Sequence, residues 1–444
     1  MSEAFLSEPF RPDQAHPTQA HPDHIHELIG IGFGPSNLAL AIALEERQSG
    51  LDAVFLEAKP RFAWHPGMLL KGTDMQVSFL KDLVSQRNPT SGFSFLSYLH
   101  DKGRLERFIN RKTFFPSRVE FNDYLDWAAG RLGGICAYDQ RVEAIEPVRA
   151  GAGVSHLRIH SRDGAGRATV RQARQIVLAP GGQPHWPELF APHRSDARLS
   201  HSNDFTARVL PKLTPGERIA VIGGGQSACE IFATLAADPA CPRVDLILRG
   251  PALKPADDSP FVNEIFEPAH TDLVHALPPE ARAQHLREFA GTNYAVTDLD
   301  LLQHIYGLLY EQEVEGAARL RMMAETQPVG LQTVGQGAGL HLTLDAQGRR
   351  FGLDYDRIIL CTGYRRELGQ TLLSGLADWQ TGAAPDRDYR LPMKPGFAPT
   401  VHVQGYSEPT HGLADTLLSV LALRSAEIAA SVELARADRR IAAE

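Results

Sequence analysis

The chain has 444 residues with a formal net charge of −8, and 43% of its residues are hydrophobic while 22% are charged. This length exceeds what one core usually serves, so the sequence predicts a globular protein of two or three domains. Dispersed basic residues exclude a nucleic-acid footprint, and both a transmembrane segment and a signal peptide are missing, so we expect a cytoplasmic protein.

Residues 1–24 contain four prolines and three histidines and show no apolar periodicity. Such a composition predicts a flexible N-terminal tail. The alternative is metal binding by His16, His21 and His24. We expect no metal site.

Residues 26–44 predict a strand, a tight turn and a helix in succession. We expect Gly30 to permit the turn and Gly32 to let the backbone approach a pyrophosphate. Gly34 completes the glycine-rich turn, and Pro35 stands where a GxGxxG pattern has its third glycine. The helix beginning at Pro35 and Ser36 would offer free N–H groups and its positive dipole end to phosphates.

A second apolar run, residues 53–56, ends in Glu57. An acid at the end of the second strand hydrogen-bonds the ribose of a bound dinucleotide. Residues 61–68, with Trp64 and His65, and residues 75–83 then form a long mixed stretch of a kind that usually carries function. A helix is predicted at 121–132 and a buried strand with a tight turn at 176–182.

Residues 218–236 repeat the strand, turn and helix with Gly223, Gly225, Gln226 and Ser227 in the turn. The following strand, residues 244–248, ends in Arg249 instead of an acid. An arginine there pairs with a 2′-phosphate, so this second site is predicted to bind NADPH and the first to bind FAD. An ordinary surface arginine is the alternative.

The sequence therefore predicts an α/β protein with two Rossmann-like dinucleotide-binding domains. We expect an FAD domain at 25–208 and 341–444 and an inserted NADPH domain at 209–340, which includes a small, mostly helical substrate-binding segment at 254–315. The buried strand at 354–364 should return the chain to the FAD domain, and strand and loop at 389–406 should follow. A long helix at 413–430 should start near Gly412 and point at the flavin.

Several long and unusual passages resemble the microbial flavin-dependent N-hydroxylating monooxygenases, which hydroxylate the side-chain amine of L-ornithine or L-lysine for siderophore synthesis. The likeness is nearest to the ornithine N5-monooxygenases of pseudomonad type and runs from about residue 25 to about residue 430. The passages that carry it are residues 30–37, 76–89, 121–125, 223–228, 254–264, 292–294, 362–364 and 415–419.

The resemblance implies that Lys81 and Asn263 hold the substrate's α-carboxylate and α-amine, that Asn293 also contacts the substrate backbone, and that Ser419 lies near the side-chain amine and the flavin. The resemblance implies three catalytic residues close to the reacting atoms: Gln76, Asn293 and Ser419. The implied cofactor contacts, beyond the first turn and Glu57, are Trp64, His65, Gln76, Gly223, Gly225, Gln226, Ser227, Arg249, Thr362, Gly363, Tyr364 and Leu417.

Two of these residues could instead have ordinary structural roles without any contact to a substrate. Lys81 in Phe-Leu-Lys-Asp-Leu fits a solvated lysine, but a buried charge needs a partner and a substrate carboxylate supplies one. Asn263 fits a turn amide. Two positions depart from the family pattern: Cys361 replaces an alanine, which should be nearly neutral, and Gly369 stands where His or Pro is usual.

The activity implied by the resemblance is N5-hydroxylation of L-ornithine with FAD, NADPH and O₂ through a C4a-hydroperoxyflavin. The alternatives are an L-lysine N6-hydroxylase, a diamine N-monooxygenase and, more remotely, a redox-sensing flavoprotein without enzyme activity. A disulfide reductase is excluded because Cys136, Cys229, Cys241 and Cys361 form no CxxC pair. The family suggests a homo-oligomer, a tetramer or dimer.

Overall fold

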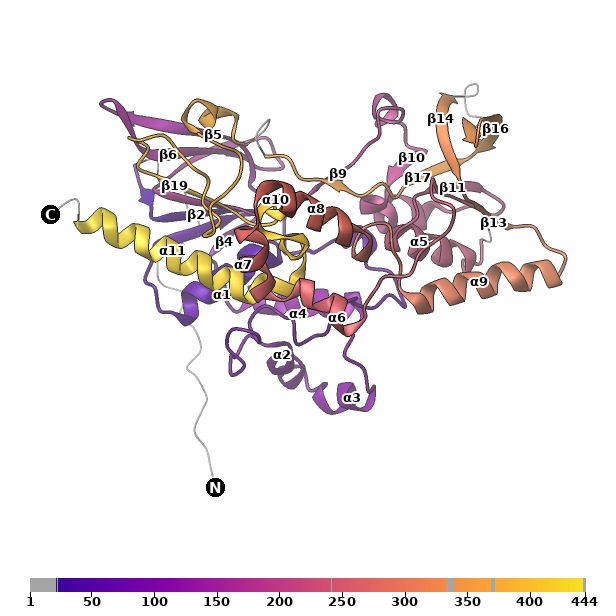
Figure 1. Ribbon diagram of the computed structural model, residues 1–444, viewed down its shortest axis with the longest axis horizontal. Coiled ribbons are helices and arrows are strands. Elements are labelled where there is room, and N and C mark those ends of the chain that lie inside the picture. The colour runs from indigo at the N-terminus through magenta and orange to yellow at the C-terminus, as the bar shows by residue number, and fades with distance from the viewer. Residues whose placement is uncertain (1–20, 22, 241, 334–338, 369–371, 442–444) are drawn as a thin grey trace.

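The computed structural model describes residues 21, 23–240, 242–333, 339–368 and 372–441. Two lobes lie side by side, one around β2 and α1 and the other around β11 and α5 (Figure 1). Predictions that concern residues 1–20, Cys241 and Gly369 fall outside the described residues. Among the described helices none is both long and apolar enough to cross a bilayer.

The first domain is built on a parallel five-stranded sheet. Its strands, in spatial order, are β19 (Thr400–Val403), β8 (Gln175–Leu178), β2 (Leu28–Ile31), β3 (Ala53–Leu56) and β4 (Cys136–Ala137). Helix α1 (Pro35–Glu46) follows β2, and nine of its twelve residues are buried. It therefore lies between the sheet and α11 (Leu421–Ile441), as a helix with buried residues on all sides must.

A second, four-stranded sheet completes this domain. It consists of β1 (Ile25–His26), β7 (Ala168–Ala173), β6 (Gly153–Arg162) and β5 (Arg141–Ala150). Ile145, Leu157 and Ile159 from this sheet pack in one core with the far face of the parallel sheet. The helices α2 (Phe95–Asp101), α3 (Leu105–Asn110) and α4 (Arg118–Gly130) form the lower part of the lobe in Figure 1.

The second domain also has a parallel five-stranded sheet. Its strands are β10 (Leu199–His201), β17 (Arg357–Leu360), β11 (Arg218–Ile222), β12 (Arg243–Ile247) and β13 (Leu320–Met323). The helices α5 (Gln226–Ala236) and α9 (Leu299–Val314) share its core. An antiparallel sheet of β14 (Thr326–Thr333), β15 (Leu340–Ala346) and β16 (Arg349–Tyr355) packs on the other face.

The prediction that the strand within 354–364 closes the FAD domain is wrong. β17 pairs with β10 through Ile358–Leu360 and with β11 through Arg357–Leu360, so it is a central strand of the second sheet. The first sheet is closed instead by β19, which pairs with β8. Buried parallel strands all look alike in sequence, and only pairing assigns them to a sheet.

The C-terminal helix begins later than predicted. Residues Leu413–Thr416 and Leu418–Val420 form two separate 3₁₀ turns, and α11 starts at Leu421. Gly412 has a φ of 94°, which no helix accommodates. The chain therefore approaches α11 through an irregular loop, and this loop carries Leu417 and Ser419.

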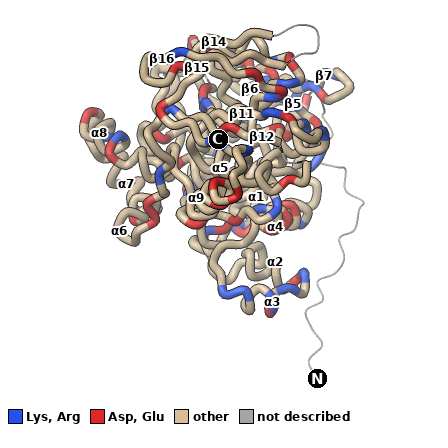
Figure 2. The backbone as a smooth tube through the Cα atoms, turned by 90° about the vertical axis from the view of Figure 1, so that its right-hand side faces the viewer, with Lys and Arg blue, Asp and Glu red and all other residues tan. Residues whose placement is uncertain are grey.

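The predicted substrate segment is largely helical. It contains α6 (Pro260–Asn263), α7 (Pro268–Ala276), α8 (Pro279–Phe289) and the whole of α9. In Figure 2 the helices α6, α7 and α8 stand to one side of the sheets, and charged residues of both signs are interspersed along the chain. α10 (Glu408–His411) of the C-terminal loop lies against α7 and α8.

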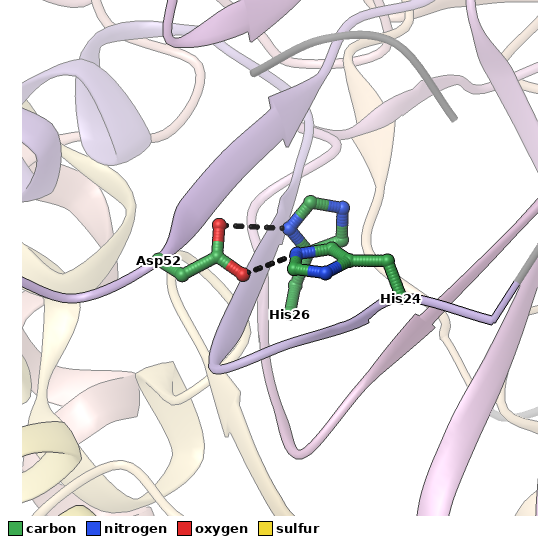
Figure 3. Close-up of side chains that lie close together, drawn as sticks. All are labelled: His24, His26 and Asp52. Carbon is green, nitrogen blue, oxygen red and sulfur yellow. Dashed lines mark hydrogen bonds and ion pairs between the residues drawn. The ribbon is translucent and has the colours of Figure 1, made fainter. Parts of the chain in front are cut away.

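The described end of the N-terminal tail is held by one carboxylate. Asp52 accepts a hydrogen bond from the ring of His24 at 2.6 Å and one from the ring of His26 at 3.1 Å, one at each oxygen (Figure 3). The three side chains lie close enough to hold an ion, but both carboxylate oxygens already have an imidazole partner. The cluster joins the residues before β2 to the residue before β3.

Candidate active site

A cleft of about 2420 Å³ lies between the two domains. Its walls come from the loop after residue 68, the second glycine-rich turn, the substrate segment and the C-terminal loop. It brings together the predicted site residues Gln76, Lys81, Gly223, Gly225, Gln226, Ser227, Arg249, Asn263, Asn293, Thr362, Gly363, Tyr364, Leu417 and Ser419. The remaining predicted residues lie in the first domain: Gly30 within β2, Gly32, Gly34, Pro35 and Ser36 in the turn and the start of α1, and Glu57, Trp64 and His65 in the chain after β3.

The predicted role of Gly30 in the turn is wrong, whereas the approach of the Gly32 backbone to a pyrophosphate stays a prediction. Gly30 lies inside β2, where a Cβ would meet the Phe55 ring at 2.1 Å, so it serves packing and not the turn. Gly32 makes the turn, with a φ of 83° and only 2.4 Å between an added Cβ and the carbonyl oxygen of Ala179. Gly34 has nothing within 4 Å of its Cβ position and is therefore the glycine with open space before α1.

The start of α1 is free to bind an anion. Gly34 is the N-cap residue, and no side chain caps the helix. Pro35 has no N–H, and the other N–H groups of the first helical turn need a partner, which a phosphate supplies. Glu57 stands beside the turn: it is buried, accepts a hydrogen bond from the Phe33 N–H at 2.8 Å, and pairs with Lys59 at 3.1 Å.

A buried arginine fixes the second residue of α1. The guanidinium of Arg424 donates to the Ser36 hydroxyl at 2.9 Å and forms an ion pair with Asp415 at 2.9 Å. Both charged side chains are almost fully buried. Nearby, Arg424 Nε, Gln404 Oε1 and Ser407 Oγ are buried without a hydrogen-bond partner. Unsatisfied buried polar atoms around an uncapped helix start fit a site for a polar dinucleotide.

An aromatic cluster lies where the domains meet. The His65 ring lies 5.2 Å from Trp64 and 5.8 Å from Tyr364, and Tyr364 lies 5.5 Å from His201. Desolvation of His65 and the charges of Arg118, Lys59 and Arg366 lower the pKa of its imidazole to about 4. A neutral imidazole therefore faces Tyr364 at pH 7. The structure thus joins Trp64 and His65 to Tyr364, although they lie far apart in the sequence.

The second glycine-rich turn has the geometry expected of a nucleotide cradle. Gly223 has a φ of 149°, and a Cβ there would lie 2.5 Å from the carbonyl oxygen of Cys361. Gly225 is the uncapped N-cap residue of α5, and its Cβ position lies 3.5 Å from the nearest atom, in Ala295. Arg249 follows β12 as an exposed residue on the cleft wall, where a phosphate can reach it.

The loop after β17 connects this turn to the aromatic cluster. The Thr362 hydroxyl donates to the His185 carbonyl at 2.5 Å, and the His185 N–H donates to the Gly363 carbonyl at 2.9 Å. The pair of strands β9 (Gln183–Pro184) and β18 (Tyr364–Arg365) lies beside these bonds. Cys361 is a free, partly buried thiol that packs against the core of the second domain and also lines the cleft, and burial raises its pKa.

The predicted substrate residues reach the cleft from four different segments. Lys81 lies on the loop before α2, Asn263 at the end of α6, Asn293 after the 3₁₀ turn of residues 290–292, and Ser419 in the loop before α11. Asn263 Nδ2 donates to the Asp258 carbonyl at 2.8 Å, which is the turn hydrogen bond of the alternative interpretation. Its side-chain oxygen has no protein donor among the described contacts.

A network of polar side chains that the sequence did not single out crosses the cleft. Asp298 accepts from Gln76 Nε2 at 3.0 Å and from Gln226 Nε2 at 2.8 Å. Gln226 Nε2 also donates to Glu230 at 2.8 Å, and Glu230 pairs with Arg118 at 2.7 Å. Burial raises the pKa of Glu230 while Arg118 and Gln226 oppose that rise. An isolated Asp in a segment of mixed composition gives no sequence signal for such a role.

A further hydrogen bond connects the substrate segment to the C-terminal loop. The Tyr294 hydroxyl donates to Glu408 of α10, which links the loop of Asn293 to the C-terminal loop. Burial and the neighbouring carboxylate raise the pKa of Tyr294 to about 12. Burial raises the pKa of Glu408 as well, against the hydrogen bond from Tyr294.

Comparison with known proteins places this geometry among flavin monooxygenases. The family model described as L-lysine 6-monooxygenase/L-ornithine 5-monooxygenase matches residues 24–366. The L-ornithine N(5)-monooxygenase of Pseudomonas aeruginosa is 44% identical over 414 residues, which cover 92% of this chain and 94% of the relative.

Two solved structures are close in fold. The ornithine hydroxylase PvdA from Pseudomonas aeruginosa superposes with a TM-score of 0.89 at 43% identity, covering 93% of this chain and 100% of that one. The Kutzneria sp. 744 ornithine N-hydroxylase KtzI, solved with reduced FAD, NADP⁺ and L-ornithine, superposes with a TM-score of 0.88 at 37% identity, with the same coverage.

Proposed function

The chain belongs to the L-lysine 6-monooxygenase/L-ornithine 5-monooxygenase family, and from this premise we propose that it is an L-ornithine N5-monooxygenase that uses FAD and NADPH in siderophore synthesis. The observation that carries the proposal is the cleft, in which Lys81, Asn263, Asn293 and Ser419 face the second glycine-rich turn across one space. The high identity to ornithine enzymes over nearly the whole chain supports the choice of substrate.

The residues present fit both cofactors. Gly34, the uncapped start of α1 and Glu57 would hold the pyrophosphate and ribose of FAD. Gly225, Ser227 and Arg249 would hold the phosphates of NADPH. When bound, the flavin supplies the oxygen chemistry and the nicotinamide supplies the hydride.

The protein's own task is to bind and orient the amino acid. Lys81 is the cation for the substrate carboxylate, because its head reaches the cleft from a loop whose neighbours Phe79 and Leu83 pack in the core. A charge-assisted hydrogen bond of this type is about twice as strong as a neutral one. Asn263 and Asn293 offer amide oxygens to the ammonium group and amide donors to the carboxylate.

The side-chain amine must lose its proton before it can act as a nucleophile. A free alkylamine has a pKa of about 10.4, so nearly all of it is protonated at pH 7. Asn293 and the buried Ser419 surround the amine with neutral groups, and a neutral site favours the uncharged amine. The hydroxylated product should therefore increase from pH 6 toward pH 8–9.

The experiment measures hydroxylated product per NADPH consumed, with L-ornithine, L-lysine and putrescine side by side from pH 6 to pH 9. We expect the highest product per NADPH with ornithine, and we expect this ratio to rise with pH. One methylene is worth about 1–3 kcal/mol in a binding pocket, so lysine should react at least tenfold less efficiently. Equal coupling with lysine would contradict the substrate, and a flat pH profile would contradict attack by the neutral amine.

A further inference from the structure

Asp298 is the residue immediately before α9, and its carboxylate joins two glutamines from different domains. One oxygen accepts a hydrogen bond from Gln76 of the first domain at 3.0 Å, and the other accepts one from Gln226 at the start of α5 at 2.8 Å. All three residues lie on the wall of the cleft. One carboxylate thus fixes the relative position of two side chains that face the cofactor space.

The Asp298 carboxylate hydrogen-bonds the two glutamines and not an N–H group of its own helix. Asp298 occupies the N-cap position of α9, where an Asp usually accepts a hydrogen bond from the second or third N–H of its helix, but it makes no such bond. Ser94 and Ser117, at the same position before α2 and α4, both cap their helices. Local helix stability is therefore given up in favour of contacts across the cleft, a pattern typical of functional residues.

The hydrogen bonds of the Gln226 side-chain amide fix its orientation. Its Nε2 donates to Asp298 and to Glu230, and its Oε1 accepts from the Asp298 N–H at 2.9 Å. Glu230 is in turn held by Arg118 of α4 at 2.7 Å. The network runs from the first domain through α5 to the start of α9, so displacing any member disturbs the others.

We propose that Asp298 is a positioning residue for the hydroxylation: it holds Gln76 and Gln226 in the orientation in which they bind the flavin and the nicotinamide nucleotide. The inference rests on the proposed function, because it gives Gln76 and Gln226 their cofactor roles.

The test compares Asp298→Asn with Asp300→Asn. The first substitution keeps the shape of the side chain but presents an NH₂ group to one of the two glutamine NH₂ groups, so either one hydrogen bond is lost or the exposed Gln76 amide must turn over and change its orientation. Asp300 is an exposed residue in the first turn of α9 that lines the same cleft but hydrogen-bonds neither glutamine. Its substitution removes the same charge from the same helix end. NADP⁺ affinity is measured by isothermal titration of the FAD-loaded protein, and product per NADPH is measured with L-ornithine.

We expect Asp298→Asn to weaken NADP⁺ binding about tenfold and to lower product per NADPH by at least half, while Asp300→Asn changes neither. A loss of thermal stability in Asp298→Asn with unchanged NADP⁺ affinity and unchanged coupling would reduce Asp298 to a structural residue and overturn the inference. So would equal effects of the two variants.

A double-mutant cycle with Gln76→Leu separates positioning from an independent contribution. If Asp298 acts through Gln76, the double variant should lose no more coupling than Gln76→Leu alone, whereas additive losses would show that Asp298 acts without it. The wild-type protein decides the proposed function separately. If it fails to hydroxylate ornithine, that function is wrong; if it hydroxylates ornithine and Asp298→Asn does so equally well, only the role of Asp298 is wrong.

Discussion

Gly34 offers the sharpest test of where FAD binds, because a side chain there should be tolerated by the fold and not by the cofactor. Its φ of −80° is accessible to every residue, and nothing lies within 4 Å of the Cβ position. Replacing a glycine N-cap by alanine costs about 0.5–1 kcal/mol, so the apoprotein of Gly34→Ala should unfold only a few degrees lower. We expect FAD affinity to fall at least tenfold, about 1.4 kcal/mol, and further in Gly34→Val.

The neighbouring glycines provide matched controls with a different outcome. Gly30→Ala forces a methyl group into the Phe55 ring, an overpacking that costs about 1–3 kcal/mol and that Phe55→Leu should partly relieve. Gly32→Ala adds about 1–2 kcal/mol for its left-handed backbone to the clash with Ala179, and no single substitution relieves both. Both variants should destabilise the apoprotein more than Gly34→Ala does.

The assay combines thermal unfolding of the apoprotein with titration of FAD by flavin fluorescence. Normal FAD affinity in Gly34→Val would refute the assignment of the pyrophosphate to the start of α1. An apoprotein of Gly34→Ala as unstable as that of Gly32→Ala would show that the open space at residue 34 has been misjudged.

Three further predictions concern single charges. Lys81→Ala should raise the KM for ornithine about ten- to a hundredfold, from loss of about 1.5–3 kcal/mol, while NADPH oxidation without substrate persists; an unchanged KM would remove Lys81 from the substrate site. Arg249→Ala should raise the KM for NADPH much more than that for NADH, since only NADPH has a 2′-phosphate, and equal changes would contradict this role. Burial alone would raise the pKa of Asp52, but His26 and His24 outweigh it and lower the pKa. A lowered carboxylate pKa stabilises the fold above the unfolded value of about 3.9 and stops doing so as the pH falls through the folded value. In acid-unfolding experiments Asp52→Asn should therefore be less stable than wild type at pH 5, by less than about 1 kcal/mol because the group is partly exposed, and converge with it near pH 2.

The sequence predicts the local parts of the fold well. Both strand, turn and helix units are confirmed, with α1 at Pro35–Glu46 and α5 at Gln226–Ala236. These units can be predicted because the apolar periodicity, the glycines and the proline that determine them lie within a few residues of one another. The two dinucleotide-binding folds follow from them.

Features that depend on contacts between distant parts of the chain could not be predicted from the sequence. The assignment of β17 to the first domain failed because strand pairing depends on partners far away in the chain, and β17 and β19 are equally buried. The role of Gly30 was misplaced because the Phe55 ring that excludes a Cβ comes from the next strand. Asp298 was missed because its partners, Gln76 and Gln226, lie far from it in the chain.

The chain crosses from one domain to the other twice, and the two crossings are joined. β9 and β18 pair as an antiparallel ribbon, with Gln183 opposite Arg365 and Pro184 opposite Tyr364, and lie between the lobes in Figure 1. A single extended strand would let one domain swivel about its axis. A hydrogen-bonded ribbon resists twisting but still flexes perpendicular to its plane, and hinges absorb motion at a few such residues. We therefore expect the lobes to move relative to each other mainly by bending at this ribbon, which would widen and narrow the cleft while the same residues continue to face each other.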